Sequence, residues 1–312
     1  MHFIKYIFFF LILIISISLL FGFYSSKEHN GDVLFVVLPG EGVKNIGLKL
    51  YQEDLIWHHY FFNICAFVSG KGSQLKAGHY LIKDPVTVVD MVNLLYSGNV
   101  VDQKITIIEG WNKNDIAGYL SQTIDNFDKD NFLSLVNSQN LEGYLFPDTY
   151  NIPYSYSEKE IIKIMIDNFN SKITEEMRSD MADKSLFEII TMASIIEKEV
   201  RSSEDMALVS GILWKRIEYG TPLQSCATIV YITGKKSVQV STEETKIESP
   251  YNTYINRGLP IGPISNPGLN SIKAAIYPKD SEYFFYLSKP DGETVFSKTF
   301  DEHIQAKNKY LK

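Results

Sequence analysis

Glu197 lies in a segment whose apolar residues recur with helical spacing, which is an unusual place for a carboxylate. Residues 184–200 predict a helix, and at about 100° per residue Glu197 falls on the same arc as Ile190 and Val200. Glu199 is expected on the opposite, solvated side. A buried carboxyl, whose pKa rises toward about 6 in known pockets, suits a general acid at neutral pH. A glutamate satisfied by a structural partner would produce the same pattern, so both interpretations stay open.

The composition limits the classes of ligand. The chain has 312 residues, a net charge of −7 and no strongly basic segment, so nucleic acid is not an expected partner. Its length suffices for two or three domains with a sizeable core. The two cysteines, Cys65 and Cys226, lie in apolar stretches and are expected to be free and buried. No Cys/His cluster predicts a metal site, and no cofactor is expected.

An uncharged apolar run near the N-terminus, residues 6–24, predicts a membrane-spanning helix. As a helix it would be roughly 28 Å long, close to the hydrocarbon thickness of about 30 Å. Bulky residues continue to Tyr24 without a small-residue cleavage site, so we expect a retained anchor. Because Lys5 precedes the run, the positive-inside rule places residues 1–5 in the cytoplasm. The rest of the chain would then lie outside the cytoplasmic (inner) membrane.

A polar linker (25–32) and a small α+β module (33–104) are predicted after the anchor. Strands are expected at 33–38 and 74–83, and helices at 43–56, 58–69 and 87–98. The module is similar to a degenerate LysM-type carbohydrate-binding unit. A spacer or packing domain is the other interpretation.

The remaining domain, 105–312, is expected to be mostly helical up to about Tyr219. Helical spacing recurs at 113–125, 129–136, 158–168, 174–180, 184–200 and 204–219. After Gly220, prolines divide the chain into short segments, and only the stretch 269–276 looks helical. A hairpin is expected over 283–297. The predicted fold class is therefore α+β: a transmembrane helix, a small α+β subdomain, and a mainly helical domain with a short-stranded C-terminal part.

Four segments hold most of the polar side chains that could bind or cut a substrate. They are EGYLFPDTY (142–150), ASIIEKE (193–199), LQSCATIVY (223–231) and SPYNTYINRGLPIGPISNPG (249–268). The last is a long Gly/Pro-rich loop inside a folded domain, and such loops are usually functional. Its aromatic faces, amides and hydroxyls suit a sugar, although a structural knot of turns would also explain it.

These segments, in this order, resemble the MltG (YceG-like) endolytic peptidoglycan transglycosylases, and FSKTFDEH (296–303) matches that family's terminal motif. The resemblance covers nearly the whole chain from the anchor on. It implies cleavage of the MurNAc-β-1,4-GlcNAc bond in nascent strands, which leaves 1,6-anhydro ends and terminates glycan elongation. It also assigns the catalytic acid to the first glutamate of the EKE run, Glu197.

The resemblance further suggests which side chains hold the glycan. The candidates are Gln224, Ser225, Tyr251, Asn252, Thr253, Tyr254, Asn266, Glu142 and Tyr144. A structural role is left open for the last two. The expected partners are peptidoglycan strands and cell-wall synthases in the membrane.

The chain departs from the family pattern at three places. Ile261 stands where the family has a second proline, EGW (109–111) stands where it usually has a Pro-Glu-Gly strand end, and the third place follows LQS. Cys226 and Ala227 stand where the family has Asp-Pro, so one carboxylate is missing. A weakly active or inactive membrane-tethered homologue that binds glycan or acts as a scaffold is therefore the alternative. A hydrolytic muramidase, which would leave reducing ends, is a third interpretation.

Overall fold

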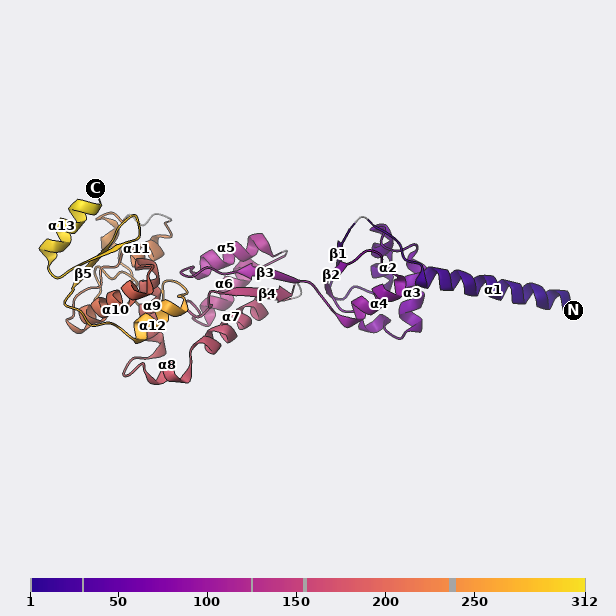
Figure 1. Ribbon diagram of the computed structural model, residues 1–312, viewed down its shortest axis with the longest axis horizontal. Coiled ribbons are helices and arrows are strands. Elements are labelled where there is room, and N and C mark those ends of the chain that lie inside the picture. Colours follow the sequence, from indigo (N-terminus) through magenta and orange to yellow (C-terminus); the bar gives the residue numbers. More distant parts are fainter. Residues whose placement is uncertain (1, 30, 125, 154–155, 236–239, 312) are drawn as a thin grey trace. The chain divides into compact units, whose positions relative to one another are not determined.

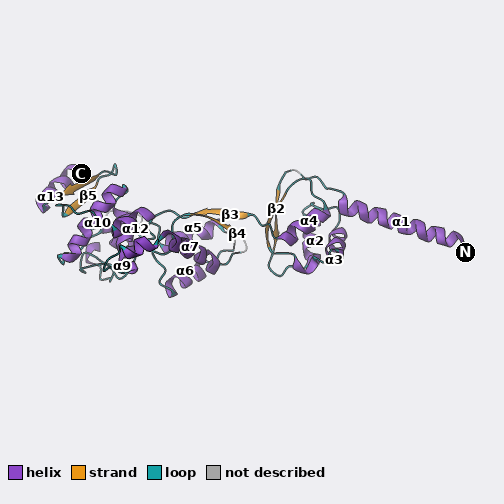
Figure 2. Cartoon of the chain, turned by 60° about the horizontal axis from the view of Figure 1, so that its bottom comes forward, coloured by secondary structure: helices purple, strands orange, loops and turns teal. Residues whose placement is uncertain are grey.

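The computed structural model describes residues 2–29, 31–124, 126–153, 156–235 and 240–311, and the chain divides into two compact units (Figure 1). Unit 1 comprises Met1–Lys104 and Asn151–Tyr156, and unit 2 comprises Ile105–Tyr150 and Ser157–Lys312. The described chain is mostly helical, with short strand pairs (Figure 2). This confirms the predicted mixture of helices and strands.

Unit 1 begins with a long apolar helix, α1 (His2–Tyr24). Its segment Tyr6–Tyr24 has a mean hydropathy of 2.7 and is long enough to cross a membrane. The predicted separate tail is part of this helix, except Met1, which lies outside the described residues. The predicted linker is tied down, because the Lys27 N–H donates a hydrogen bond to the Val86 carbonyl.

The rest of unit 1 is an antiparallel strand pair covered by helices. Its elements are β1 (Val33–Val37), α2 (Val43–Gln52), α3 (His59–Val68), the 3₁₀ turn η1 (Gly72–Gln74), β2 (Gly78–Ile82) and α4 (Val88–Ser97). Phe35 on β1 lies opposite Tyr80 on β2, and both pack with Phe62 of α3 in a fully buried core. As expected, Gly98 ends α4 with a left-handed backbone, φ 73°.

A second strand pair is formed by β3 (Asp102–Thr106) and β4 (Thr149–Pro153), and the division between the units falls within both strands. Unit 2 holds the remaining elements. They are α5 (Lys113–Thr123), α6 (Lys129–Ser138), α7 (Glu158–Lys172), α8 (Glu175–Ser179), α9 (Leu186–Glu199), α10 (Ser203–Glu218), α11 (Cys226–Thr233), η2 (Glu244–Lys246), α12 (Leu269–Ile276), β5 (Phe285–Ser288), β6 (Thr294–Ser297) and α13 (Phe300–Tyr310).

The helices predicted before Gly220, the helix α12 and the hairpin β5–β6 are confirmed. The prediction that only one helix follows Gly220 was wrong, because α11 and α13 are also helical. The sequence of α11, CATIVYIT, has no charged residue and only two threonines among apolar residues, so it shows no clear helical periodicity. The start of α13 is a capping box formed by Thr299 and Glu302, a signal that was present in the sequence.

The central helix of unit 2 is α9, which packs against α10, α11 and α12. It begins at a capping box on Ser185, and residues 189–196 are buried without a break. A helix that is apolar on all sides has no solvated face. The prediction that Glu199 lies on a solvated side was therefore wrong: Glu197 and Glu199 are both half-buried.

Candidate active site

Glu199 ends α9, and its carboxylate is enclosed by groups distant in sequence. Its Oε1 accepts a hydrogen bond from the Ser225 hydroxyl. Further hydrogen bonds come from the Tyr286 hydroxyl and the Ala227 N–H, and the Arg216 guanidinium lies nearby. Burial raises the pKa of Glu199 above its ordinary value, although these partners pull it down. The negative end of the α9 dipole also disfavours a charged carboxylate there. Burial therefore favours the protonated form of this carboxyl more than in an exposed glutamate.

Arg216 is a fixed cation beside this carboxyl. Its Nη1 donates to the Leu223 carbonyl at 2.8 Å, and its Nε and Nη2 donate to the Phe284 carbonyl at 3.2 and 3.0 Å. Burial lowers the pKa of Arg216, but a guanidinium stays charged at any ordinary pH. Because its donors are held by backbone carbonyls, the charge stays in place when Glu199 loses or gains a proton.

Ser225 is itself buried, but the residues on either side of it, Gln224 and Cys226, are exposed. Cys226, at the start of α11, is exposed, so its predicted burial was wrong, and the half-buried Cys65 is also free. The Tyr254 hydroxyl lies 3.0 Å from the Cys226 sulfur. Gln224 is exposed with φ 52°, a left-handed conformation that is strained for a residue with a side chain. Such strain is often found at functional sites.

Glu197 has a different set of partners. Its Oε2 accepts hydrogen bonds from the Gly268 N–H at 2.9 Å and the Ser271 hydroxyl at 2.7 Å. Gly268 is the N-cap of α12, so this carboxylate caps a helix. Glu109 lies alongside, and a Cβ on Gly268 would come within 2.0 Å of its Oε1. Burial and the neighbouring Glu197 raise the pKa of Glu109.

A fourth carboxyl, Glu142, is only 7% exposed. The Lys113 N–H donates to its Oε1 and Oε2 at 3.0 and 3.3 Å, and the Tyr231 hydroxyl donates to its Oε2 at 3.3 Å. Asn266 Nδ2 donates to Oε1 at 3.1 Å. Burial raises the pKa of Glu142 to about 7, against the effects of Lys113, Tyr231 and Asn266. Since both oxygens have protein partners, Glu142 acts as an internal junction.

Asn266 completes this junction. Its Oδ1 accepts from the N–H groups of Gly143 and Leu145, both at 2.9 Å, and its Nδ2 also donates to the Trp111 carbonyl at 2.9 Å. The side chain is fully buried. It therefore joins the segment 249–268 to the segment 142–150 through three hydrogen bonds, and to Trp111 through a fourth.

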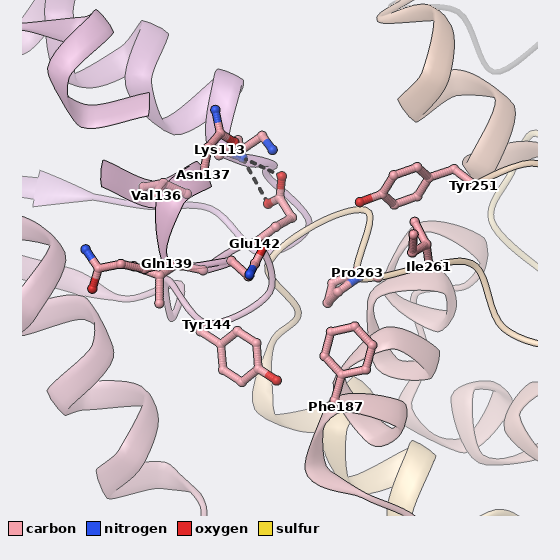
Figure 3. Close-up of a pocket in the computed structure, with 13 residues that line it drawn as sticks. Lys113, Val136, Asn137, Gln139, Glu142, Tyr144, Phe187, Tyr251, Ile261 and Pro263 are labelled. Carbon is pink, nitrogen blue, oxygen red and sulfur yellow. Dashed lines mark hydrogen bonds between the residues drawn. The ribbon is translucent and has the colours of Figure 1, made fainter. Parts of the chain in front are cut away.

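A pocket of about 610 Å³ lies beside Glu142 (Figure 3). Figure 3 shows the Glu142 carboxylate turned toward the Lys113 backbone, with the rings of Tyr144, Phe187 and Tyr251 around the opening. The lining also includes Val136, Asn137, Gln139, Asn140, Leu141, Ile261, Gly262 and Pro263. Aromatic faces with amide groups form a surface suited to sugar rings and N-acetyl groups.

The predicted glycan-binding residues divide into two groups. Buried, with hydrogen bonds to other protein groups, are Ser225, Asn252, Thr253, Asn266 and Glu142. Exposed or half-buried, and so open to a ligand, are Gln224, Tyr251, Tyr254 and Tyr144. Buried Asn252 is typical of the first group, because its Nδ2 donates to two backbone carbonyls and its Oδ1 accepts from the Tyr254 N–H. Hydrogen bonds of this kind fix the shape of the loop 249–268, which contains Tyr251 and Tyr254.

Sequence reasoning missed three residues around the carboxyls. Arg216 lies at the end of an amphipathic helix, where a basic residue is ordinary. Tyr286 comes from a hairpin 87 positions after Glu199, so nothing local relates the two. Glu109, in contrast, belongs to the EGW sequence at 109–111, which departs from the family pattern but was given no role.

Comparisons with known proteins agree with this architecture. A model of the YceG-like family matches residues 35–309. The endolytic murein transglycosylase of Bacillus subtilis is 33% identical over 315 residues, covering 91% of this chain and 86% of that protein. The protein of that name from Streptococcus pneumoniae is 28% identical, covering 85% of this chain and 56% of its own longer sequence.

A solved structure is also similar. The crystal structure of a putative YceG-like protein from Listeria monocytogenes aligns with a TM-score of 0.60 at 28% identity, covering 90% of this chain and 100% of that one. The family match spans most of the chain, and the Bacillus relative exceeds 30% identity over nearly its full length. This chain therefore belongs to the YceG-like family.

Proposed function

We propose that this chain is a membrane-anchored endolytic lytic transglycosylase that cleaves the MurNAc-β-1,4-GlcNAc bond of nascent peptidoglycan and so terminates glycan elongation. Its family and its relatives named endolytic murein transglycosylase support this activity. The structural observation that carries the proposal is the Glu199 carboxyl. Burial raises its pKa, and it touches Ser225 beside the solvent-exposed Cys226.

The reaction needs one acid that later acts as a base. The protonated carboxyl gives its proton to the glycosidic oxygen as the bond to C1 of the muramic acid breaks. The carboxylate then takes the proton of the C6 hydroxyl, and the C6 oxygen bonds to C1 to give the 1,6-anhydro end. The carboxyl is protonated again and no water is consumed. A second carboxylate, which glycoside hydrolysis usually requires, is not needed.

We assign this role to Glu199, with Glu197 as the alternative that the sequence suggested. Glu199 lies beside a fixed cation, Arg216, which would stabilise the carboxylate after proton loss. Ser225 and Tyr286 orient the group by hydrogen bonds. Glu197 is instead occupied in capping α12. The positioning of a carboxyl by such neighbours is a common property of catalytic acids.

The pocket beside Glu142 supports an assignment as a subsite for the glycan strand. The helix α11 connects the two places, since its N-cap Ser225 touches Glu199 and its Tyr231 touches Glu142. Six residues of helix span about 9 Å, a distance suited to a neighbouring sugar of the same strand. We propose that Tyr144 and Tyr251 contact this sugar and that Gln224 and Tyr254 contact the sugar at the cleaved bond.

A weakly active or inactive glycan-binding homologue is the second candidate. It is favoured by Cys226 and Ala227, which replace the Asp-Pro of the family pattern next to Glu199. In that case the pocket would bind strands without cutting them.

We propose that α1 is retained as a single anchor in the cytoplasmic (inner) membrane, with a cytoplasmic N-terminus and both units outside. The apolar segment Tyr6–Tyr24 supports a membrane span. The order β1, α2, α3, β2 is compatible with a LysM-like subdomain, which would guide the strand. Cell-wall synthases are the partners proposed, because they make the strand that this enzyme would cut.

The test is incubation of the full-length chain, in detergent, with isolated sacculi. Release of 1,6-anhydro-muropeptides, analysed by mass spectrometry, supports the transglycosylase. Reducing-end products would indicate a muramidase, and co-sedimentation without release would indicate the inactive binder. Glu199→Gln serves as the inactive control in the same assay.

A further inference from the structure

The helix α3 (His59–Val68) contains no charged residue, yet one of its faces is exposed. Tyr60, Ile64, Phe67 and Val68 are 63%, 40%, 84% and 75% exposed. At about 100° per residue these four side chains fall within an arc of about 100°. The opposite side is buried through Phe62 and Ala66. A helix that is apolar on all sides is usually buried in a protein core or in a membrane. The exposed arc of α3 is therefore expected to be covered by another apolar surface.

The position of α3 beside α1 indicates what covers this arc. Phe61, next to Tyr60, packs against Gly22 of α1, where a Cβ would lie 2.3 Å from the ring. Phe23 meets the same ring edge-on, at 6.3 Å between centroids. Gly22 lies two residues before the end of the apolar run at Tyr24, about 3 Å along the helix axis. If α1 spans a membrane, Phe61 is therefore level with the edge of the hydrocarbon layer.

The interfacial layer beyond that edge is roughly 5–8 Å deep on each side. Residues within about one turn of Phe61, roughly 5 Å along a helix, thus lie within the depth of this layer. The neighbouring side chains fit such a layer, because Tyr60 and the 47% exposed Trp57 have rings typical of membrane interfaces. Lys27, whose Nζ lies 5.1 Å from the centre of the Trp57 ring, follows directly after α1 and suits the headgroup level.

We propose that α3 lies in the lipid interface of the membrane that α1 crosses, with Tyr60, Ile64, Phe67 and Val68 inserted among the lipids. This interaction rests on the proposed retention of α1 as an anchor. It holds unit 1 against the bilayer by two contacts, the span and the interfacial helix. Unit 1 would then be a fixed platform on the membrane rather than a domain on a loose tether.

The test uses the full-length chain in vesicles of phosphatidylethanolamine and phosphatidylglycerol whose acyl chains are either plain or brominated. Bromine quenches tryptophan fluorescence on contact. A tryptophan is introduced by Phe67→Trp, at an exposed position where the fold is not disturbed. Leu34→Trp is the matched control, because Leu34 is 46% exposed on β1, which lies on the side of unit 1 away from α1 (Figures 1 and 2). The signal of the native tryptophans is subtracted using the unsubstituted chain.

The expected result is several-fold stronger quenching of the added tryptophan in Phe67→Trp than in Leu34→Trp. Equally weak quenching of both, while the protein floats with the vesicles, would overturn the proposal and leave the anchor intact. A blue-shifted but unquenched emission from Phe67→Trp would also overturn it, because a second protein copy would then cover α3. Failure to float with the vesicles would refute the anchor itself, and with it the inference.

Discussion

Glu197 and Glu199 lie two residues apart on α9, and their carboxylates reach the N-terminal ends of two different helices. Glu197 accepts from Gly268, the N-cap of α12, and Glu199 accepts from Ser225, the N-cap of α11. Adjacent carboxylates of one helix thereby bind separate parts of unit 2. Of the two, only Glu199 is beside a guanidinium, that of Arg216, and it is the one we assign as the acid.

Glu199→Gln should lower the rate of anhydro-muropeptide release by at least about 10²-fold, because an amide cannot donate and recover the proton. Glu197→Gln should retain most of the rate and instead lower the thermal midpoint, since it weakens the cap of α12. The measurement is muropeptide release with circular dichroism melts as the folding control. A folded, active Glu199→Gln together with a folded, inactive Glu197→Gln would reverse the assignment.

Glu142 should make folding stability depend on pH. Its pKa is raised from 4.5 to about 7 in the folded state, so its protonated form is preferred there. Its contribution to the free energy of unfolding is fully present below pH 4.5 and is lost as the pH rises through 7. The total loss is about 3 kcal/mol. Glu142→Gln should remove this part of the decline between pH 5 and pH 8, measured by denaturant unfolding. An unchanged decline in the variant would show that other groups cause it.

Asn266→Ala should destabilise unit 2 by about 3–5 kcal/mol, because it leaves buried groups without a partner. The groups affected are the N–H donors of Gly143 and Leu145, which both donate to the Asn266 side chain. Asn270→Ala, at an exposed position of α12, should change stability by no more than about 0.5 kcal/mol. Urea unfolding of both variants tests the contrast, and equal losses would contradict it.

Two glycines in helices should respond to alanine in opposite directions. In α10, a Cβ on Gly211 would lie 2.1 Å from the Lys279 carbonyl oxygen. Gly211→Ala should therefore lower the free energy of unfolding by about 1–3 kcal/mol, because the Lys279 backbone must move away from α10. In α5, no atom outside the helix's own backbone lies within 4 Å of a Cβ on Gly118. Gly118→Ala should therefore raise the free energy of unfolding by about 0.5–1 kcal/mol, because alanine has less freedom than glycine in the unfolded chain. Thermal midpoints distinguish the two, and a stabilising Gly211→Ala would argue against the close packing of α10.

Cys226→Asp should move the alkaline limb of the pH–rate profile to higher pH. A carboxylate at this position would be a second negative charge near Glu199, and like charges raise the pKa of a carboxyl. An acid with a higher pKa stays protonated to a higher pH, so activity persists further. Cys226→Ser, which adds no charge, is the control. A limb that stays fixed in both variants would indicate that Glu199 is not the titrating acid.

Local patterns in the sequence determined most elements of the fold. Helical periodicity predicted the helices from α5 to α10, Gly98 predicted the end of α4, and the apolar run predicted α1. Each depends on residues a few positions apart, so the spacing along the chain contains the whole signal. The four motif segments likewise indicated the family before any contact between them was known. Where apolar and polar residues did not alternate with helical spacing, as in the mostly apolar α11, the helix was not predicted.

Tertiary structure alone decided which side chains surround each carboxylate. The helical wheel placed Glu199 in solvent, but α10, α11 and α12 pack against α9, and residues of α11 and β5 cover the Glu199 carboxylate. Asn266 and Glu142, 124 positions apart, form one buried junction, and Tyr286 reaches Glu199 from a distant hairpin. Contacts of this kind depend on how helices pack against each other. The sequence around one residue of such a pair therefore does not indicate which residue it will contact. The sequence thus determined the elements and the family, while packing decided which glutamate lies beside a guanidinium.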